Sequence, residues 1–352
     1  VGGAGKLTEA LVARLRDRGG QLVCRVPVRE VIVRGGRAVG VVLADGGELT
    51  GRAVVIATGH SARDVHELLL RAGVRLEPKP FAMGVRIEHP QPLIDQIQYG
   101  RAAGHPALPA AAYKLAFTPD RGPDDRRGAF SFCMCPGGWI VPAATEPDGV
   151  VVNGMSLSRR DSPYANSGLV VAIELADLDR LALPSPLGGV ALQRTLERAA
   201  ALAGGGGLRA PATRATDFVR GRGSSTVPAT SYAPGLTPGD VGAVLDATGL
   251  PLAARLRDAL TVFDRQMRGY LTEDAVLVGV ESRTSSPVRV PRDPDRLESP
   301  DLAGLYPCAE GAGYAGGIVS AALDGIRVAR AIAAATGTAL PAADPGHTMR
   351  GR

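Results

Sequence analysis

Glycines and one acidic residue are concentrated in the segment 304–325 of this 352-residue chain. A short apolar stretch ends at Glu310, and four glycines follow within seven residues: Gly311, Gly313, Gly316 and Gly317. Glycine lets the backbone approach a flat ligand closely and adopt positive φ angles. The helix expected from Ile318 begins with unpaired N–H groups, which suit an anion or an electron-rich carbonyl. A plain turn needs only one or two glycines, so the segment favours a ligand site in which Glu310 holds hydroxyl groups.

An apolar run at residues 53–57 ends in Thr58 and Gly59. Open α/β sheets bind their ligands at the carboxyl ends of central strands. Any buried strand can end in this way, so this motif is weak by itself. If the two segments serve one ligand, residues 53–57 and 306–309 must lie close together, and we predict that they lie in the same sheet or in touching layers.

Cys133 and Cys135 form a Cys-Met-Cys sequence. Residues two apart in a strand share a face, so both thiols would point into a ligand pocket or into the core. One interpretation is a redox dithiol, although the usual redox spacing has two intervening residues and a shorter ring is strained. Core packing is favoured over this interpretation, because cysteine is commonly buried.

Arg283 is followed by three hydroxyl residues, at positions 284–286. A guanidinium binds carboxylates through two parallel hydrogen bonds, so Arg283 is able to anchor an acidic substrate. It is equally able to form a structural tie to a nearby acid such as Glu281. The sequence leaves both interpretations open.

The charge pattern argues against a nucleic-acid partner. The net charge is +5, from 40 basic and 35 acidic residues, and 37 of the basic residues are arginine. These arginines are scattered among acidic residues and form no concentrated basic face. Aromatic residues make up only 4% of the chain, which disfavours a surface on which bases stack.

Several other classes of protein are also disfavoured. No uncharged apolar stretch is long enough to span a membrane. The four cysteines and five histidines show no metal-ligand spacing, so we expect no metal. There is no signal peptide, which predicts a cytoplasmic protein. The chain starts at Val1 in the middle of a pattern, from which we expect further sequence upstream.

Hydrophobic periodicity and turn residues predict a mixture of helices and strands. We expect helices at 6–18 and 65–70, a strand at 21–26, a three-stranded meander at 28–33, 37–43 and 48–52, and a buried strand at 53–57. The following region, 81–152, is expected to hold short strands and loops. Further on, the pattern predicts a helix within 184–203, a helical pair within 236–270, strands within 277–290, and a strand, glycine turn and helix within 304–335.

This order of elements resembles FAD-binding flavoproteins of the glutathione-reductase type. Four sequences resemble more closely a bacterial family of uncharacterised FAD-dependent dehydrogenases, also called NAD(P)/FAD-dependent oxidoreductases: residues 130–138, 153–156, 279–289 and 305–317. The resemblance implies an α/β fold, in which a Rossmann-like FAD/NAD(P)-binding domain is interrupted by an inserted strand-rich α+β substrate domain. The expected limits are 1–79 and 277–335 for the FAD-binding domain, 80–276 for the inserted domain, and 336–352 for a frayed tail.

The resemblance also assigns roles to residues. It places the backbone near Val28 at the adenine and Glu310 at the ribityl chain. It places Gly316, Gly317 and Ile318 under the pyrimidine edge of the flavin. Together with Thr58, Gly59 and Gly311, these form the expected cofactor-binding set, whereas Arg283, Cys133 and Cys135 are only weak catalytic candidates.

The activity that the resemblance implies is hydride transfer between a small molecule and FAD, with NAD(P)H as a candidate electron donor. Two alternatives are a flavin- or nucleotide-binding protein without turnover and a tRNA-modifying flavoprotein. The family's Gly-x-Gly-x-x-Gly fingerprint is not found in this sequence, because 1–5 has no strand before it and is better read as a loop before a helix. We therefore expect this chain by itself to bind FAD weakly or not at all.

Overall fold

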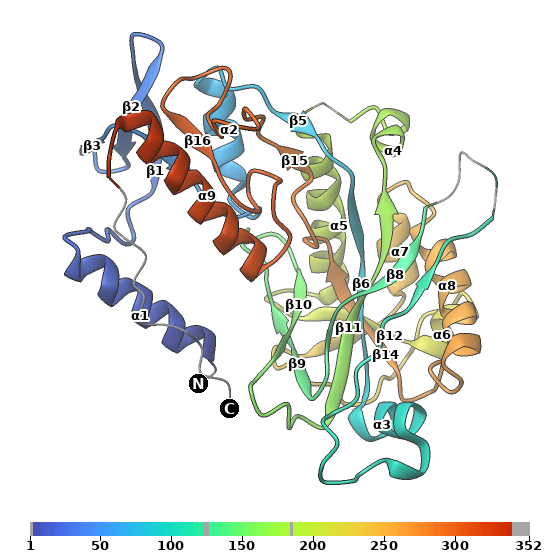
Figure 1. Ribbon diagram of the computed structural model, residues 1–352. Helices are drawn as coiled ribbons and strands as arrows, with labels where there is room; N and C mark the ends of the chain where they lie inside the picture. Colours follow the sequence, from blue (N-terminus) through green and yellow to red (C-terminus); the bar gives the residue numbers. More distant parts are fainter. Residues whose placement is uncertain (1–2, 121, 123–126, 184–185, 340–352) are drawn as a thin grey trace. The chain divides into compact units, whose positions relative to one another are not determined.

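The computed structural model describes residues 3–120, 122, 127–183 and 186–339 (Figure 1). The chain divides into two compact units. Unit 1 consists of residues 1–24 and 78–287, and unit 2 consists of residues 25–77 and 288–352.

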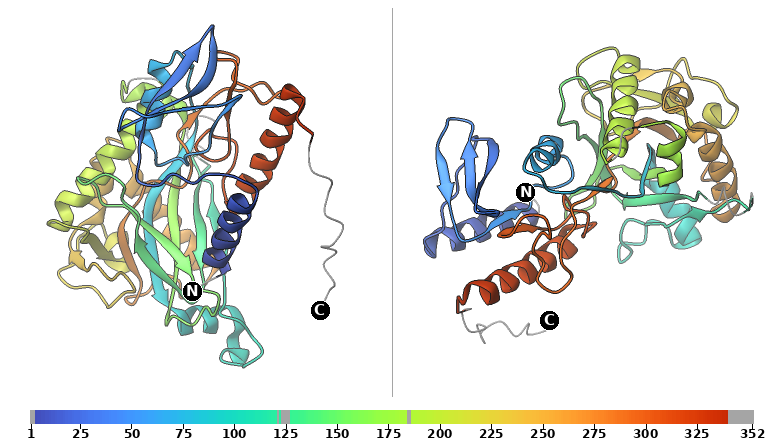
Figure 2. Two further views of the ribbon diagram at one scale, coloured as in Figure 1. Left: turned by 90° about the vertical axis from the view of Figure 1, so that its left-hand side faces the viewer. Right: turned by 90° about the horizontal axis from the view of Figure 1, so that it is seen from above.

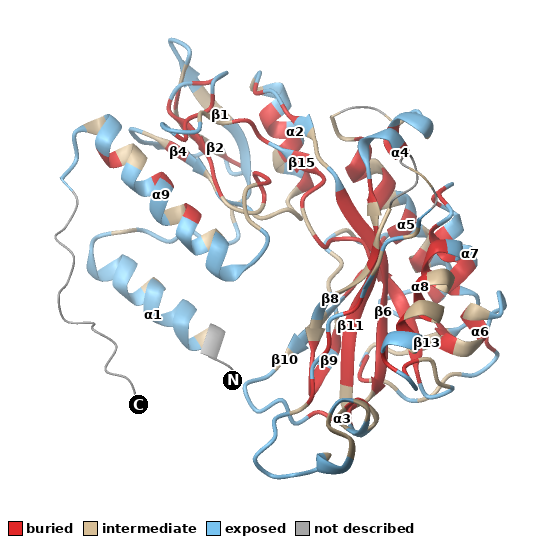
Figure 3. Cartoon of the chain, turned by 45° about the vertical axis from the view of Figure 1, so that its right-hand side comes forward, coloured by how far each residue is buried: buried red, intermediate tan, exposed pale blue. Residues whose placement is uncertain are grey.

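Unit 1 is built on a seven-stranded sheet in the order β13-β12-β14-β6-β11-β8-β7. Its strands are β6 (Phe81–Pro90), β7 (Ala116–Phe117), β8 (Ala129–Cys135), β11 (Tyr164–Ile173), β12 (Ala210–Arg214), β13 (Leu236–Pro238) and β14 (Val276–Glu281). The two longest strands, β6 and β11, are antiparallel and pair over ten positions. Both are buried along almost their whole length and form the centre of the unit (Figure 3).

Helices and a hairpin complete unit 1. The helices are α1 (Gly3–Asp17), α3 (Gln91–Tyr99), α4 (Leu175–Arg180), α5 (Gly188–Gly204), α6 (Ala215–Val219), α7 (Val241–Asp246) and α8 (Leu252–Gln266), with a 3-10 turn η1 (Gly100–Ala102). The hairpin is formed by β9 (Gly138–Pro142) and β10 (Val152–Ser156). Apolar side chains of α5, α6, α7 and α8 join those of the sheet in one continuous core.

Two predictions for unit 1 are wrong. Residues 81–152 include the ten-residue β6 and the helix α3 in addition to short strands. The charged residues Arg86 and Glu88 interrupt the apolar pattern of β6, yet both are buried and hydrogen-bonded in the fold. The expected strand at 21–26 does not form, and Arg25 there has a left-handed φ of 62°, which ends an extended run.

Unit 2 joins two segments that are far apart in the sequence. Its first part is the predicted meander, β1 (Val28–Arg34), β2 (Arg37–Leu43) and β3 (Glu48–Thr50), seen as the blue ribbon in Figure 2. The strand β4 (Val54–Ile56) and the helix α2 (Arg63–Arg71) follow. The second part contains β16 (Leu305–Pro307) and the helix α9 (Ile318–Thr336). The short strands β5 (Glu77–Pro78) and β15 (Val288–Arg289) pair where the chain passes between the units.

The predicted pairing of the two distant apolar runs is confirmed. Strands β4 and β16 are parallel, with Leu305 opposite Val54 and Pro307 opposite Ile56. The two strands are about 250 residues apart in the sequence. Their pairing places the turn after β4 and the turn after β16 in the same unit.

The limits of the units differ from the expected domain limits. Residues 277–287 belong to unit 1, because β14 pairs with β6 and β12 in the large sheet. Residues 1–24 also group with unit 1. Within the expected tail 336–352, α9 ends at Thr336 and residues 340–352 lie outside the described part of the chain.

Candidate cofactor site

Two turns meet by backbone contact at the carboxyl ends of β4 and β16. The N–H of Cys308 donates to the carbonyl of Ile56 at 2.9 Å, which extends the strand pairing into the turns. Gly59 then has a φ of +74°. A Cβ atom at Gly311 would lie 2.6 Å from the carbonyl oxygen of Gly59. Only glycine at position 311 therefore allows the turns to approach this closely.

Glu310 lies in this pair of turns, as the sequence predicts. Its Oε2 is 3.4 Å from Nδ1 of His60, and the two side chains are 29% and 19% exposed. The carboxylate is thus held beside an imidazole while part of it faces solvent. Carboxylate oxygens accept hydrogen bonds from hydroxyl groups, so this position suits a polyol chain.

His66 on α2 contacts the turn that follows β16. Its Nε2 lies 3.3 Å from the carbonyl oxygen of Gly311 and must donate, because a carbonyl only accepts. Burial lowers the pKa of His66, which favours the neutral ring, although the bond to Gly311 opposes this shift. The buried Nδ1 has no hydrogen-bond partner among the described residues. In the sequence the histidines show only the absence of metal-ligand spacing, so neither His60 nor His66 was predicted as a site residue.

A buried ion pair holds the turn between β16 and α9. Arg292 donates to both carboxylate oxygens of Asp324, at 2.9 and 2.7 Å. The same carboxylate accepts from the N–H of Ala309 at 2.8 Å. Burial alone would raise the pKa of Asp324, but the hydrogen bonds from Arg292 and Ala309 lower it. Arg292 also stacks 3.9 Å from the ring centroid of Tyr314, so that tyrosine fills the loop.

The start of α9 is open. No side chain caps the helix, and Gly317 is extended, with a φ of 172°. A Cβ at Gly316 would meet no atom within 4 Å, and one at Gly317 would meet only Ser320 Oγ at 4.0 Å. Ile318 is 80% exposed. No strained backbone angle requires glycine at these two positions. Both glycines leave open space beside the start of α9, which carries a partial positive charge.

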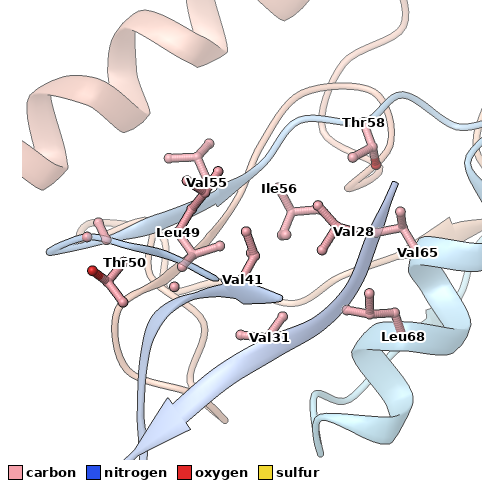
Figure 4. A pocket seen from close by; sticks show the side chains of 14 residues that line it. Val28, Val31, Val41, Leu49, Thr50, Val55, Ile56, Thr58, Val65 and Leu68 are labelled. Carbon is pink, nitrogen blue, oxygen red and sulfur yellow. The ribbon is translucent and has the colours of Figure 1, made fainter. Parts of the chain in front are cut away.

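An apolar cavity of about 360 Å³ lies between the meander, β4 and α2. Figure 4 shows its side chains converging from these three elements. It is lined by Val28, Val31, Gly40, Val41, Leu49, Thr50, Gly51, Ala53, Val54, Val55, Ile56, Thr58, Val65 and Leu68. The structure therefore brings the predicted residues Val28 and Thr58 to one cavity, while Gly59, Glu310 and Gly311 lie at the turns that follow its strand. The lining suits an apolar ring and offers little to a phosphate.

Arg283 belongs to unit 1 and is tied to an acid. It is buried, and its Nε and Nη2 donate to the two carboxylate oxygens of Glu197 at 3.0 and 2.9 Å. The partner suggested by the sequence, Glu281, instead accepts from Nη1 of Arg86 at 2.6 Å. The structure thus shows a structural tie with a different partner from the one expected.

The two cysteines of β8 do not share one environment. Cys135 is buried, but Cys133 is exposed, so the expected packing of both thiols in the core is wrong. The reason is a bulge: the pairing of β8 with β11 shifts between Gly168 opposite Phe132 and Asn166 opposite Cys135. Cys133 adopts a φ of 43° at this shift, so the two residues no longer alternate as in a regular strand.

The described residues form neither a metal centre nor a membrane-spanning helix. Within the described ranges, no group of three or more His, Cys, Asp or Glu side chains converges as a metal site. None of the described helices combines the length and hydrophobicity that a bilayer crossing requires.

The residues of unit 2 fit parts of a flavin nucleotide. Glu310 can hold hydroxyls, the uncapped start of α9 can face an electron-rich ring edge, and the cavity at Val28 can take an apolar ring. For pyrophosphate, the described residues offer no glycine turn between a strand and a helix near the amino end. Gly3 and Gly5 lie in the first turn of α1, and not in the expected loop, while Val1 and Gly2 lie outside the described residues.

Comparison with known proteins agrees with this fit. Residues 80–284 match the model of the family described as "FAD-dependent protein, C-terminal domain-like", and residues 3–122 match the model of "FAD dependent oxidoreductase". An uncharacterised protein of Clostridium beijerinckii is 41% identical over 331 residues, which cover 93% of this chain and 60% of the relative. The chain thus spans about 60% of the length of this relative. The first match covers more than half of the chain, and the chain therefore belongs to this family of FAD-dependent proteins.

Proposed function

We propose that the protein is an FAD-dependent oxidoreductase that transfers hydride between a small molecule and FAD. The observation that carries the proposal is the parallel pairing of β4 with β16, which places two glycine turns in backbone contact beside an open helix start. The family match identifies FAD as the ligand for which such a site is suited. In this proposal unit 2 is the FAD-binding domain, and the substrate domain is inserted into it.

The FAD would supply the chemistry by accepting or donating a hydride at its ring. The chain's own residues would bind and orient it. Glu310 would accept hydrogen bonds from the ribityl hydroxyls, and the His60 ring beside it would hold that carboxylate in place. The N–H groups at Gly317 and Ile318 would face the pyrimidine edge, where the helix dipole stabilises negative charge.

The other residues predicted to bind the cofactor would contact the adenine or shape the turns. The backbone at Val28 would contact the adenine, and Thr58, Gly59, Gly311 and Gly316 would shape the turns around the cofactor. The word oxidoreductase in the matched description favours an enzyme over a flavin-binding protein without turnover and over a tRNA-modifying flavoprotein. Neither matched description names a nicotinamide, so NADH and NADPH should be tested as donors directly, by following flavin bleaching without oxygen.

The test uses the full-length protein and measures flavin per folded molecule. Gly317→Leu should abolish flavin binding without lowering the thermal midpoint, because the added side chain meets almost no protein atom but fills the space at the helix start. Glu310→Ala should weaken flavin affinity by a factor of about ten to a hundred, since a charged acceptor contributes roughly 1.5–3 kcal/mol. Glu48→Ala, at an exposed glutamate of the meander, is the matched control and should change neither quantity.

Two outcomes would refute the site. Full flavin content in both variants would show that neither residue contacts the cofactor. A lower thermal midpoint with constant flavin per folded molecule would show that the glycine turn has only a structural role.

A further inference from the structure

The Cys133–Cys135 segment is held by a charged network in the interior of unit 1. Arg86 in the middle of β6 is 0% exposed. Its Nη2 donates to the carbonyl oxygen of Cys133 at 2.6 Å and to the sulfur of Cys135 at 3.4 Å. The guanidinium therefore contacts both cysteines of the bulge, one through the backbone and one through its thiol.

Other partners hold Arg86 in this position. Its Nη1 donates to Glu281 at 2.6 Å, and its Nε donates to the side chain of Asn166 at 2.7 Å. Burial alone would lower the pKa of Arg86, but the charge and the hydrogen bond of Glu281 raise it, so the guanidinium is charged. These hydrogen bonds thus hold the guanidinium of Arg86 in place beside the bulge.

Two glycines on neighbouring strands make room for this network. A Cβ at Gly154 of β10 would lie 2.0 Å from Nη2 of Arg86, and a Cβ at Gly168 of β11 would lie 2.9 Å from Glu281. Replacing a buried ion pair by apolar side chains is often neutral or stabilising, so stability alone does not explain this arrangement. What the network provides is a defined geometry at the cysteines.

The bulge gives the two thiols unequal access to solvent. Cys133 is exposed and has a φ of 43°, a strained angle for a residue with a side chain. Cys135 is buried two residues further on and points its sulfur toward the carbonyl of Cys133, at 3.3 Å. An accessible thiol next to a sheltered one is the arrangement of an attacking and a resolving cysteine.

From this arrangement we infer that Cys133 and Cys135 form a reversible dithiol–disulfide site that exchanges with small disulfides. The thiolate of Cys133 attacks one sulfur of the disulfide, forms a mixed disulfide and releases one thiol. The thiolate of Cys135 then attacks the sulfur of Cys133 and releases the second thiol. The two cysteines lose two electrons and two protons, and the small disulfide gains both and becomes two thiols.

The geometry of the chain allows this ring. Two residues span at most about 7 Å even when fully extended, which is near the upper limit of the Cα separations that disulfides tolerate, and the left-handed φ of Cys133 departs from the extended form. Arg86 places a positive donor at the sulfur of Cys135, where it stabilises the thiolate that attacks and, in the reverse direction, the thiolate that leaves. A strained ring of this kind is easily reduced, which suits a site that cycles and not a permanent cross-link.

The test is made on the full-length protein with Cys24 replaced by serine, because Cys24 is the other exposed cysteine among the described residues. The protein is equilibrated with mixtures of reduced and oxidised glutathione, quenched with an alkylating agent and mapped by mass spectrometry. We expect both cysteines to become protected together, in one peptide that carries an internal disulfide. Cys135→Ser should instead retain one glutathione on Cys133. In Cys133→Ser, the remaining Cys135 should react with oxidised glutathione at least about tenfold more slowly.

Arg86→Lys separates a positioning role from a merely structural one. It keeps the charge but loses the planar fork, so the rate at which the mixed disulfide resolves should fall by about tenfold while the protein remains folded by circular dichroism. Cys308→Ser is the control for a buried cysteine outside the network and should leave all rates unchanged. The proposal is overturned if the two thiols are alkylated independently at every glutathione ratio, or if Cys135→Ser accumulates no mixed disulfide. The cysteine site lies in unit 1 and its test needs no flavin. A negative result for the dithiol site is therefore distinct from a negative result for the proposed FAD function.

Discussion

The central strands of the two units are buried to very different extents. Along β6 of unit 1, every residue from Phe81 to His89 is buried. In unit 2, Val55 in the middle of β4 is 44% exposed, and Ile318 at the start of α9 is 80% exposed. Exposed apolar surface of this kind marks sites where proteins bind something. The contrast lies in these central elements, because apolar side chains are exposed on the surface of both units, as at Leu202 of unit 1.

The charged groups differ in the same direction. Unit 1 buries Arg283 with Glu197 and Arg86 with Glu281, and each pair is closed by short hydrogen bonds. Unit 2 has a similar buried pair, Arg292 with Asp324, but its pair of His60 and Glu310 lies 3.4 Å apart and remains partly exposed. Buried charges must be paired because desolvation is costly, whereas a partly exposed carboxylate can still accept a ligand's hydrogen bonds. This difference supports the proposal that Glu310, in the turns of unit 2, contacts the cofactor.

The largest effect is expected from breaking a buried pair of unit 1. Arg283→Met should destabilise unit 1 by about 3–5 kcal/mol, because it leaves the carboxylate of Glu197 buried without its cation. The double variant with Glu197→Gln should recover part of that loss. Urea unfolding followed by the fluorescence of Trp139, the single tryptophan of the chain, measures this effect in unit 1. A stable single variant with lost activity would show instead that Arg283 serves a substrate.

A smaller effect is expected from Glu88, which makes a pH-dependent contribution to the stability of unit 1. Burial raises the pKa of Glu88 from 4.5 to about 7, although the hydrogen bonds from Ser231 oppose the shift. The folded state thus holds this proton more tightly than the unfolded state, which stabilises the fold fully below pH 4.5. That stabilisation, at most about 3 kcal/mol, is lost as the pH rises to 7.

Glu88→Gln is the variant that isolates this dependence. The free energy of unfolding of the natural protein, relative to the variant, should fall between pH 4.5 and 7 and then stay constant. Burial also lowers the pKa of the neighbouring His89, to about 4, but its contribution cancels in the difference. A difference that does not change with pH would mean that Glu88 is ionised throughout, held by Ser231 and Arg86.

The smallest effects should separate two glycines of unit 2. Gly311→Ala should destabilise unit 2 by about 1–3 kcal/mol, because its Cβ would overlap the backbone of Gly59, which cannot move aside easily. Gly316→Ala faces open space and should change stability by less than about 0.5 kcal/mol. Hydrogen exchange of β16 and α9, read by mass spectrometry, compares the two variants. Equal effects of the two substitutions would contradict the distinction between Gly311, which packs against Gly59, and Gly316, which faces open space.

Local elements and the cofactor family could be predicted from the residues. The meander and the two glycine-rich turns could be predicted because turn residues and apolar periods act over a few residues, whereas the proximity of β4 and β16 was predicted from the assumption that both turns serve one ligand. The motifs at 130–138 and 305–317 identified the FAD-dependent family, which the comparison confirmed. Arg86 and Glu88, in contrast, concealed β6, because a charge in the sequence does not reveal a partner that lies 100 or more residues away.

The three-dimensional fold was needed to show which glycines pack, which face open space, and which cysteine is exposed. Gly311 and Gly316 are equivalent in the sequence, but one lies against Gly59 and the other meets no atom within 4 Å. Cys133 and Cys135 would share a face in a regular strand, and a shift in the pairing with β11 separates them. These properties depend on the atoms that the fold brings from elsewhere in the chain, and a local pattern carries no information about those atoms.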